Sequence, residues 1–349
     1  MSSEFTEHCG ATTNIGNPPI HREKVMADRA DLKELTREQL AAWLEQKGLR
    51  PFRAAQILKW VYIRQADNFS EMTDLRKDVR ELLSQEFSID RLKREGIEVS
   101  RDGSRKYLFG LRDGRTIEAV LIPEREHYTL CVSTQVGCAQ DCRFCLTATG
   151  GFERNLTRGE IISQVRDCLA LAPDDRPLRN LVFMGMGEPL ANYRHLVSAL
   201  AVITDHDCGL KFAHRRVTVS TAGLVPRMAD LGKDTKVNLA VSLNATDDAV
   251  RSRLMPINRA YPLAVLLEAC RVYPLPSGRK ITFEYILLKG INDSLADARR
   301  LAKLLAPIKA KINLIPFNAH AGSPFETTGE AQLLAFQEVL LKRHYTVVI

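Results

Sequence analysis

Apolar residues recur with two different periods along the chain, and the period changes near residue 100. Between Leu32 and Phe87 they return every three or four positions, which is typical of helices with one buried face. We predict three helices there, at about 36–48, 52–62 and 74–83. This part of the chain is therefore predicted to form a small helical module.

A strand pattern with a period of two follows the helical module. Lys106–Leu111 and Thr116–Ile122 flank Arg112-Asp113-Gly114, a sequence typical of a hairpin turn. Tyr128–Ser133 is a third predicted strand. We therefore expect a β-hairpin extension after the helices.

Beyond residue 150, short apolar strands alternate with amphipathic helices. The predicted strands are 180–185, 216–220, 237–243, 281–287 and 312–316, and the predicted helices are 157–171, 192–204, 224–231, 262–273, 293–306 and 328–343. This order predicts an α/β fold in which a parallel sheet has its helices outside. With Tyr128–Ser133 as the first strand there are about six units, so we expect a partial (β/α)6 barrel with its ligands at the C-terminal strand ends.

These patterns divide the chain into four parts. Residues 1–28 are a polar segment that we expect to be flexible, 29–95 are the helical module, 96–126 the hairpin extension and 127–349 the barrel. The chain has no run of 18 apolar residues and no visible secretory signal, so we expect no membrane partner and a cytoplasmic location. The net charge of +7 permits a polyanionic partner.

Four of the eight cysteines crowd into fifteen residues, of which Cys131 lies in the third predicted strand and the other three come after it. Cys138, Cys142 and Cys145 have the spacing C-x3-C-x2-C, and three thiolates on one loop are able to hold three irons of a [4Fe–4S] cluster. The fourth iron would then stay open to another ligand. The alternative is a structural zinc site with Cys131 as the fourth thiolate.

A second motif, Met184-Gly185-Met186-Gly187-Glu188-Pro189, follows the apolar residues of the predicted strand Asn180–Phe183. Glycines let a backbone approach a ligand closely, and a glutamate beside them is able to accept hydrogen bonds from an ammonium group. The alternative is an ordinary strand-to-helix turn with a solvated glutamate.

Together the two motifs make the chain resemble the radical S-adenosylmethionine superfamily, whose C-x3-C-x-aromatic-C loop holds a [4Fe–4S] cluster. Further stretches resemble the RlmN/Cfr subfamily of rRNA adenine-C2 or C8 methyltransferases, most closely RlmN. These stretches are Phe52–Ile57, Val132–Cys138, Gly151–Leu156, Gly185–Leu190 and Leu314–Asn318. The resemblance covers about residues 32–349.

The resemblance implies a role for particular residues. Cys138, Cys142 and Cys145 are expected to hold the cluster, whose open iron binds S-adenosylmethionine. The pocket of that cofactor is expected to include Gly187, Glu188, Ser220, Ser242, Leu243, Asn244 and Asn318. Asn244 departs from the family, in which we expect histidine. Glu118 matches the proposed proton acceptor, and Cys131 matches the cysteine that forms a transient disulfide.

The activity implied is methylation of adenine C2 in 23S rRNA, with tRNA as a second candidate, through a methyl-cysteine intermediate. The helical module would bind RNA, and a flavodoxin or ferredoxin would donate the electron to a monomeric enzyme. A C8-specific enzyme, a radical enzyme with another product and a zinc-stabilised RNA-binding protein remain alternatives.

The subfamily carries its methyl-accepting cysteine in an Arg- and Asp-rich tail, whereas no cysteine follows Cys270 here. We expect truncation or divergence to explain this difference. A form without that cysteine is expected to cleave S-adenosylmethionine but to transfer no methyl group.

Overall fold

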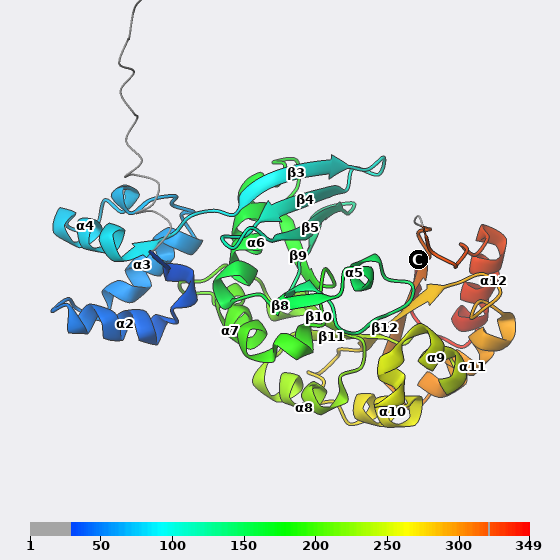
Figure 1. Ribbon diagram of the computed structural model, residues 1–349. Helices are drawn as coiled ribbons and strands as arrows, with labels where there is room; N and C mark the ends of the chain where they lie inside the picture. Colours follow the sequence, from blue (N-terminus) through cyan, green and yellow to red (C-terminus); the bar gives the residue numbers. More distant parts are fainter. Residues whose placement is uncertain (1–28, 320–321) are drawn as a thin grey trace, which may run out of the picture.

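The computed structural model describes residues 29–319 and 322–349. The segment 1–28, which we expected to be flexible, lies outside the described residues. Figure 1 shows three parts along the molecule: a helical module, an antiparallel sheet and a curved parallel sheet with helices on its outer side. No helix of the described residues is long and apolar enough to cross a membrane.

Three helices form the N-terminal module, as predicted: α2 (Arg37–Gln46), α3 (Arg53–Tyr62) and α4 (Lys77–Glu86), with 3-10 turns η1 (Leu32–Glu34) and η2 (Phe69–Glu71). Thr36 and Gln39 form a capping box at the start of α2, in which each side chain accepts a hydrogen bond from the other residue's N–H. A short parallel pair, β1 (Ala30–Asp31) with β2 (Phe87–Ser88), joins the two ends of the module.

The next four strands are antiparallel: β3 (Lys93–Val99), β4 (Arg105–Gly110), β5 (Thr116–Pro123) and β6 (Tyr128–Cys131). The predicted hairpin is β4–β5, and Gly114 in its turn has a φ of +81°. We did not predict β3, because all but one of its seven residues are exposed and its sequence has no apolar face. Its charged side chains protect an open sheet edge from pairing with another chain.

The parallel part of the sheet begins at β6 and continues through β9 (Leu178–Phe183), β10 (Val217–Thr221), β11 (Asn238–Ser242), β12 (Ile281–Leu287), β13 (Ala310–Pro316) and β14 (Val347–Val348). The whole ten-stranded order is β14-β13-β12-β11-β10-β9-β6-β5-β4-β3. The predicted partial (β/α)6 barrel is confirmed. β14 was not predicted, because two residues are too short to show a period.

Helices α6 (Arg158–Leu171), α7 (Tyr193–Ile203), α8 (Val225–Asp234), α9 (Asp248–Leu254), α10 (Leu263–Arg271), α11 (Leu295–Leu305) and α12 (Glu330–Leu341) connect these strands, with 3-10 turns η3 (Pro189–Asn192), η4 (His214–Arg216) and η5 (Pro256–Arg259). Six of the helices match predicted ones, and α9 is new.

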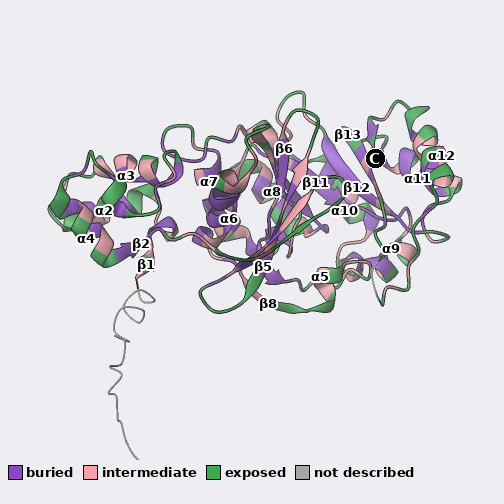
Figure 2. Ribbon diagram, turned by 90° about the horizontal axis from the view of Figure 1, so that it is seen from above, coloured by how far each residue is buried: buried purple, intermediate pink, exposed green. Residues whose placement is uncertain are grey.

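The two faces of the parallel sheet differ in chemistry. Val219, Leu239 and Phe283 are completely buried and alternate along their strands with residues that line a cavity, and Figure 2 shows the buried residues gathered along the sheet. The other face carries polar side chains in one row, because Ser242 pairs with Glu284 and Glu284 with Asn313 in register. A polar face inside a barrel sheet predicts a ligand site rather than a hydrophobic core.

A buried guanidinium joins the helical module to the barrel. Arg166 of α6 donates hydrogen bonds to the carbonyls of Val61 (3.2 Å), Ile89 (3.0 Å) and Ala66 (2.5 Å), all in or beside the module. Its side chain is completely buried. Because carbonyls in the module receive these bonds, the module is held in a fixed position against the barrel.

Candidate active site

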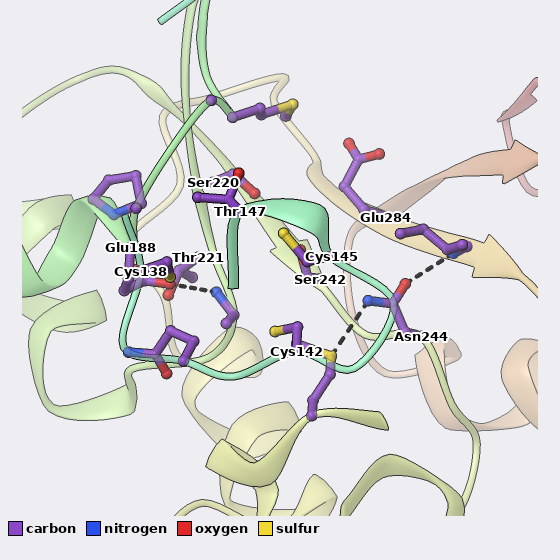
Figure 3. Close-up of a pocket in the computed structure, with 18 of the residues that line it drawn as sticks. Cys138, Cys142, Cys145, Thr147, Glu188, Ser220, Thr221, Ser242, Asn244 and Glu284 are labelled. Atoms are coloured by element: carbon purple, nitrogen blue, oxygen red, sulfur yellow. Dashed lines mark hydrogen bonds between the residues drawn. The ribbon is translucent and has the colours of Figure 1, made fainter. Parts of the chain in front are cut away.

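A cavity of about 260 Å³ opens at the C-terminal ends of the barrel strands. Predicted site residues that line it are Cys138, Cys142, Cys145, Gly187, Glu188, Ser220, Ser242 and Asn244. They come from segments more than 100 residues apart in the sequence (Figure 3). The fold thus brings most of the predicted residues into one place.

The cysteine loop is closed by a hairpin that the sequence analysis did not predict, β7 (Gln135–Gly137) with β8 (Phe152–Asn155). Gly137 has a φ of +73°, and a Cβ there would lie 1.9 Å from the Gly151 oxygen, so only glycine permits this approach. The Cys138 N–H donates to that same Gly151 oxygen at 2.8 Å. The short helix α5 (Leu146–Thr149) follows the last cysteine.

The three thiols suit iron coordination. Each is half-buried at the cavity wall, and burial raises the pKa of Cys138 and that of Cys142, the latter to about 12. The free thiols of Cys138 and Cys142 would therefore stay protonated near neutral pH, whereas a bound metal deprotonates its thiol ligands outright. Three cysteines facing one cavity fit a [4Fe–4S] cluster that keeps one iron open.

The zinc alternative requires four sulfurs about 3.8 Å apart, because each Zn–S bond is about 2.3 Å long in a tetrahedron. Over residues 29–319 and 322–349, no group of three or more Cys, His, Asp or Glu side chains is placed to hold one metal ion. Cys131 lies on β6 and does not line the cavity. The arrangement gives the zinc alternative no support.

Glu188 lies beside the cluster loop and is almost completely buried. Its carboxylate accepts hydrogen bonds from the N–H groups of Leu190 (3.0 Å) and Ala222 (2.7 Å). Burial nevertheless raises its pKa to about 7. A carboxylate held in this way still has lone pairs free, and a cationic ammonium group would offset the energy of burying its charge.

Gly187 fixes the position of Glu188. Its φ is +99°, and a Cβ would lie 2.5 Å from the Cβ of Gln135. The Gln135 side chain packs against the glycine and accepts a hydrogen bond from the Glu188 N–H at 2.8 Å. The backbone also links the two loops, because Thr134 and Gln135 both donate to the Met186 carbonyl. The glutamate and the cysteines are therefore parts of one assembly.

The hydroxyls of Ser220 and Ser242 face the cavity. A strand-end serine often bonds to nearby backbone instead, and Ser133 does so, donating to the Glu118 carbonyl at 2.6 Å. Within the described part of the chain, neither Ser220 nor Ser242 has a side-chain hydrogen bond. Both hydroxyls are therefore available to a ligand.

The remaining pocket candidates differ in position. Leu243 is fully buried behind the cavity wall. Asn244 lines the cavity, but its side chain links β11 to its surroundings, accepting from the Ile286 N–H (2.8 Å) and donating to the Met255 sulfur (3.3 Å). Asn318 is exposed after β13 and does not line the cavity.

Glu118 and Cys131 lie on the antiparallel extension, outside the cavity lining. Cys131 pairs with Val120, two residues from Glu118, so both side chains are on the same sheet face. Glu118 is 42% exposed and forms an ion pair with Lys106 at 3.4 Å. Burial raises the pKa of the Cys131 thiol to about 12, although the Met184 N–H donates to its sulfur.

Two buried charged residues at the cavity were missed by the sequence analysis. Arg251 donates to the carbonyls of Ala222, Ser242 and Leu243 and so fixes the ends of β10 and β11. Glu284 projects from β12 into the cavity. A lone charge in the apolar strand Ile281–Leu287 is a sequence signal that could have revealed Glu284.

Comparison with known proteins agrees with this geometry. The profile of the Ribosomal RNA large subunit methyltransferase N-terminal domain matches residues 30–89, and that of the Radical SAM superfamily matches 132–302. The chain is 57% identical to the Dual-specificity RNA methyltransferase RlmN of Desulfosudis oleivorans, over 91% of this chain and 86% of that protein. The chain belongs to the RlmN family of radical S-adenosylmethionine enzymes.

Two further similar proteins support the same assignment. RlmN of Geobacter sulfurreducens is 54% identical over 91% of this chain and 87% of its own. A radical SAM methyltransferase from Sphaerobacter thermophilus superposes with a TM-score of 0.86 at 39% identity, covering 91% and 94% of the two chains. The protein is therefore an enzyme whose cofactors are a [4Fe–4S] cluster and S-adenosylmethionine.

Proposed function

We propose that this enzyme methylates C2 of adenine in 23S rRNA and in tRNA through a methyl-cysteine intermediate. The observation that carries the proposal is one cavity lined by three cysteines, Glu188 and two serines with free hydroxyls. When bound, the cluster and S-adenosylmethionine supply one-electron cleavage of a sulfonium. The name of the relatives, dual-specificity RNA methyltransferase, supports two RNA substrates.

The protein's own groups would act as follows. Cys138, Cys142 and Cys145 hold the cluster, and Glu188 accepts hydrogen bonds from the methionyl ammonium. Ser220 and Ser242 bind the rest of S-adenosylmethionine, with Gly187 and Asn244 in the wall and Leu243 packed behind it. The exposed position of Asn318 is compatible with a contact only once a ligand extends beyond the cavity.

Glu118 would take the proton that leaves the adenine ring, and Cys131 would supply one thiol of the transient disulfide. Both lie on one sheet face next to the cavity, and Met184, which donates to the Cys131 sulfur, lines it. An RNA base lying across this face would meet both groups.

The helical module, residues 29–95, would bind the RNA. Phe52 is 62% exposed, and the guanidinium of Arg53 lies 5.7 Å from its ring centroid. An exposed aromatic ring beside arginine suits base stacking and phosphate contact. We place 96–126 as the extension and 127–349 as the core. A flavodoxin or ferredoxin would donate electrons to a monomer in the cytoplasm, where both RNAs occur.

The test uses protein expressed from its gene through the natural stop codon, with the cluster assembled without oxygen. It receives reductant, S-adenosylmethionine and 23S rRNA or tRNA from a strain lacking this modification, and nucleosides are analysed by mass spectrometry. We expect 2-methyladenosine from both RNAs. Formation of 8-methyladenosine, or 5′-deoxyadenosine release with no RNA product from protein that carries the C-terminal methyl-accepting cysteine, would contradict the proposal. The 349-residue chain, in which no cysteine follows Cys270, should release 5′-deoxyadenosine without methylating either RNA.

A further inference from the structure

Glu284 is a buried carboxylate for which the proposed reaction has no role. It is 5% exposed, lies in the middle of β12 and faces the cavity. Glu284 is paired in register with Ser242 on the neighbouring strand β11 and with Asn313 on the other neighbour, β13. Adjacent strands are about 4.8 Å apart, so a ligand group that reaches the Ser242 hydroxyl is also close to Glu284.

One oxygen of Glu284 is held in place and the other is not. The Asn313 side-chain amide donates to Oε2 at 2.6 Å. Among the described residues, no group donates to Oε1. Burial raises the pKa of Glu284 to about 7, although the Asn313 hydrogen bond and the charge of Lys311 lower it in part. A buried carboxylate with an oxygen directed at a cavity lacks the donors that usually offset its burial, and a ligand is able to provide them.

The two buried carboxylates of the cavity stand apart. Glu188 follows β9 and Glu284 lies on β12, so three strand spacings, about 14 Å along the sheet, separate their strands. Figure 3 shows them on opposite sides of the pocket, with Cys142, Cys145 and Ser242 between them. A ligand that spans the cavity with its ammonium group at Glu188 would present its other end to Glu284.

Charge and hydrogen-bond chemistry select the group at that end. The methionyl carboxylate would be repelled by Glu284, and the methionyl ammonium is assigned to Glu188. An adenine edge places an acceptor nitrogen beside its amino group. This nitrogen would face a carboxylate oxygen, and two acceptors cannot form a hydrogen bond. The two adjacent ribose hydroxyls are both donors, and a carboxylate is able to accept from both.

We propose that Glu284 binds the 2′- and 3′-hydroxyls of the S-adenosylmethionine ribose, with Asn313 holding the carboxylate in position. This inference rests on the proposed placement of the methionyl group at Glu188. It makes Glu284 a specificity residue for a ribose with both hydroxyls, in addition to the serines of the cavity.

The test is a binding cycle that needs no turnover. Protein with its cluster assembled is titrated calorimetrically with S-adenosylhomocysteine and with its 2′-deoxy, 3′-deoxy and inosine analogues. We expect Glu284→Gln to bind S-adenosylhomocysteine about tenfold more weakly, because one charged hydrogen bond of this kind is worth roughly that factor. Asn313→Ala should weaken binding about threefold. The control is Glu268→Gln, an exposed residue of α10, which should bind as the wild type does.

The analogues decide where Glu284 acts. Removing a ribose hydroxyl should cost the wild type about tenfold in affinity but Glu284→Gln less than twofold, while the inosine analogue should weaken both proteins equally. The inference would be overturned if the deoxy analogues lost the same affinity for both proteins, or if only the inosine analogue behaved differently between the wild type and Glu284→Gln. Either result would leave the proposed function standing. If the wild type itself binds no S-adenosylhomocysteine, the proposed site fails instead.

Discussion

Replacing Gly187 by alanine tests whether this glycine fixes the position of Glu188. The backbone at Gly187 has a φ of +99°, where an L side chain costs about 1–3 kcal/mol. The new Cβ would also lie 2.5 Å from the Gln135 Cβ, so Gln135 must move. Its 2.8 Å hydrogen bond from the buried Glu188 N–H is then lost, at a further cost of about 1–3 kcal/mol. The expected destabilisation is about 2–6 kcal/mol.

Gly114→Ala is the matched control, because Gly114 also has a positive φ, +81°, but its Cβ would meet nothing within 4 Å. That variant should lose only the backbone cost of about 1–3 kcal/mol, and its affinity for S-adenosylmethionine should stay unchanged. Gly187→Ala should bind S-adenosylmethionine at least tenfold more weakly, because Glu188 moves with its loop. Urea unfolding followed by circular dichroism and equilibrium dialysis measure the two quantities. Equal behaviour of the two variants would refute the reasoning.

Three further predictions concern separate parts of the molecule. Glu284→Gln should stabilise the ligand-free protein at pH 8 by up to about 3 kcal/mol, because the raised pKa of about 7 means that the wild type loses stability as pH rises from 4.5 through 7. At pH 5 thermal unfolding should show little gain in stability. An equal gain at both pH values would show that the gain does not come from the charge of Glu284. Arg166→Met should lower the free energy of unfolding, measured in urea, by about 3–5 kcal/mol, since it leaves buried carbonyls of the module unpaired. The control is Arg143→Met, at an exposed arginine, which should change the free energy of unfolding by under about 0.5 kcal/mol. A similar result for both variants would refute the proposed link between module and barrel. Alanine at Cys138, Cys142 or Cys145 should remove most of the bound iron, which iron and sulfide analysis will measure. The control, Cys168→Ala at a buried cysteine, should retain the iron. Full iron content in any of the three variants would contradict their assignment as cluster ligands.

Sequence periodicity predicts the regular elements of this fold well. The barrel strands other than β14 and six outer helices were expected from their apolar spacing, because each buries one face against a large core. The edge strand β3 and the hairpin β7–β8 were missed for the opposite reason. β3 is exposed along almost its whole length, and β7–β8 is held by Gly137 and by backbone bonds rather than by an apolar face.

The candidate site likewise contains residues that the sequence indicates and residues that only the structure reveals. Cysteine spacing and the Gly187-Glu188 motif indicate the cluster and its neighbouring loop directly. Arg251 has the sequence context of a surface arginine, and only the tertiary structure shows its bonds to the ends of β10 and β11. Asn318 was expected at the pocket from resemblance, yet it lies outside the cavity lining, because the chain leaves the barrel after β13.

The most direct test of the central claim is Mössbauer spectroscopy of ⁵⁷Fe-labelled protein, with its cluster assembled without oxygen, before and after adding S-adenosylmethionine. Three cysteine ligands leave one iron of about four without a protein ligand. We predict a [4Fe–4S] spectrum in which about one quarter of the iron changes its parameters when S-adenosylmethionine binds. A spectrum with no change on addition, or protein that binds one zinc and no iron, would contradict the account.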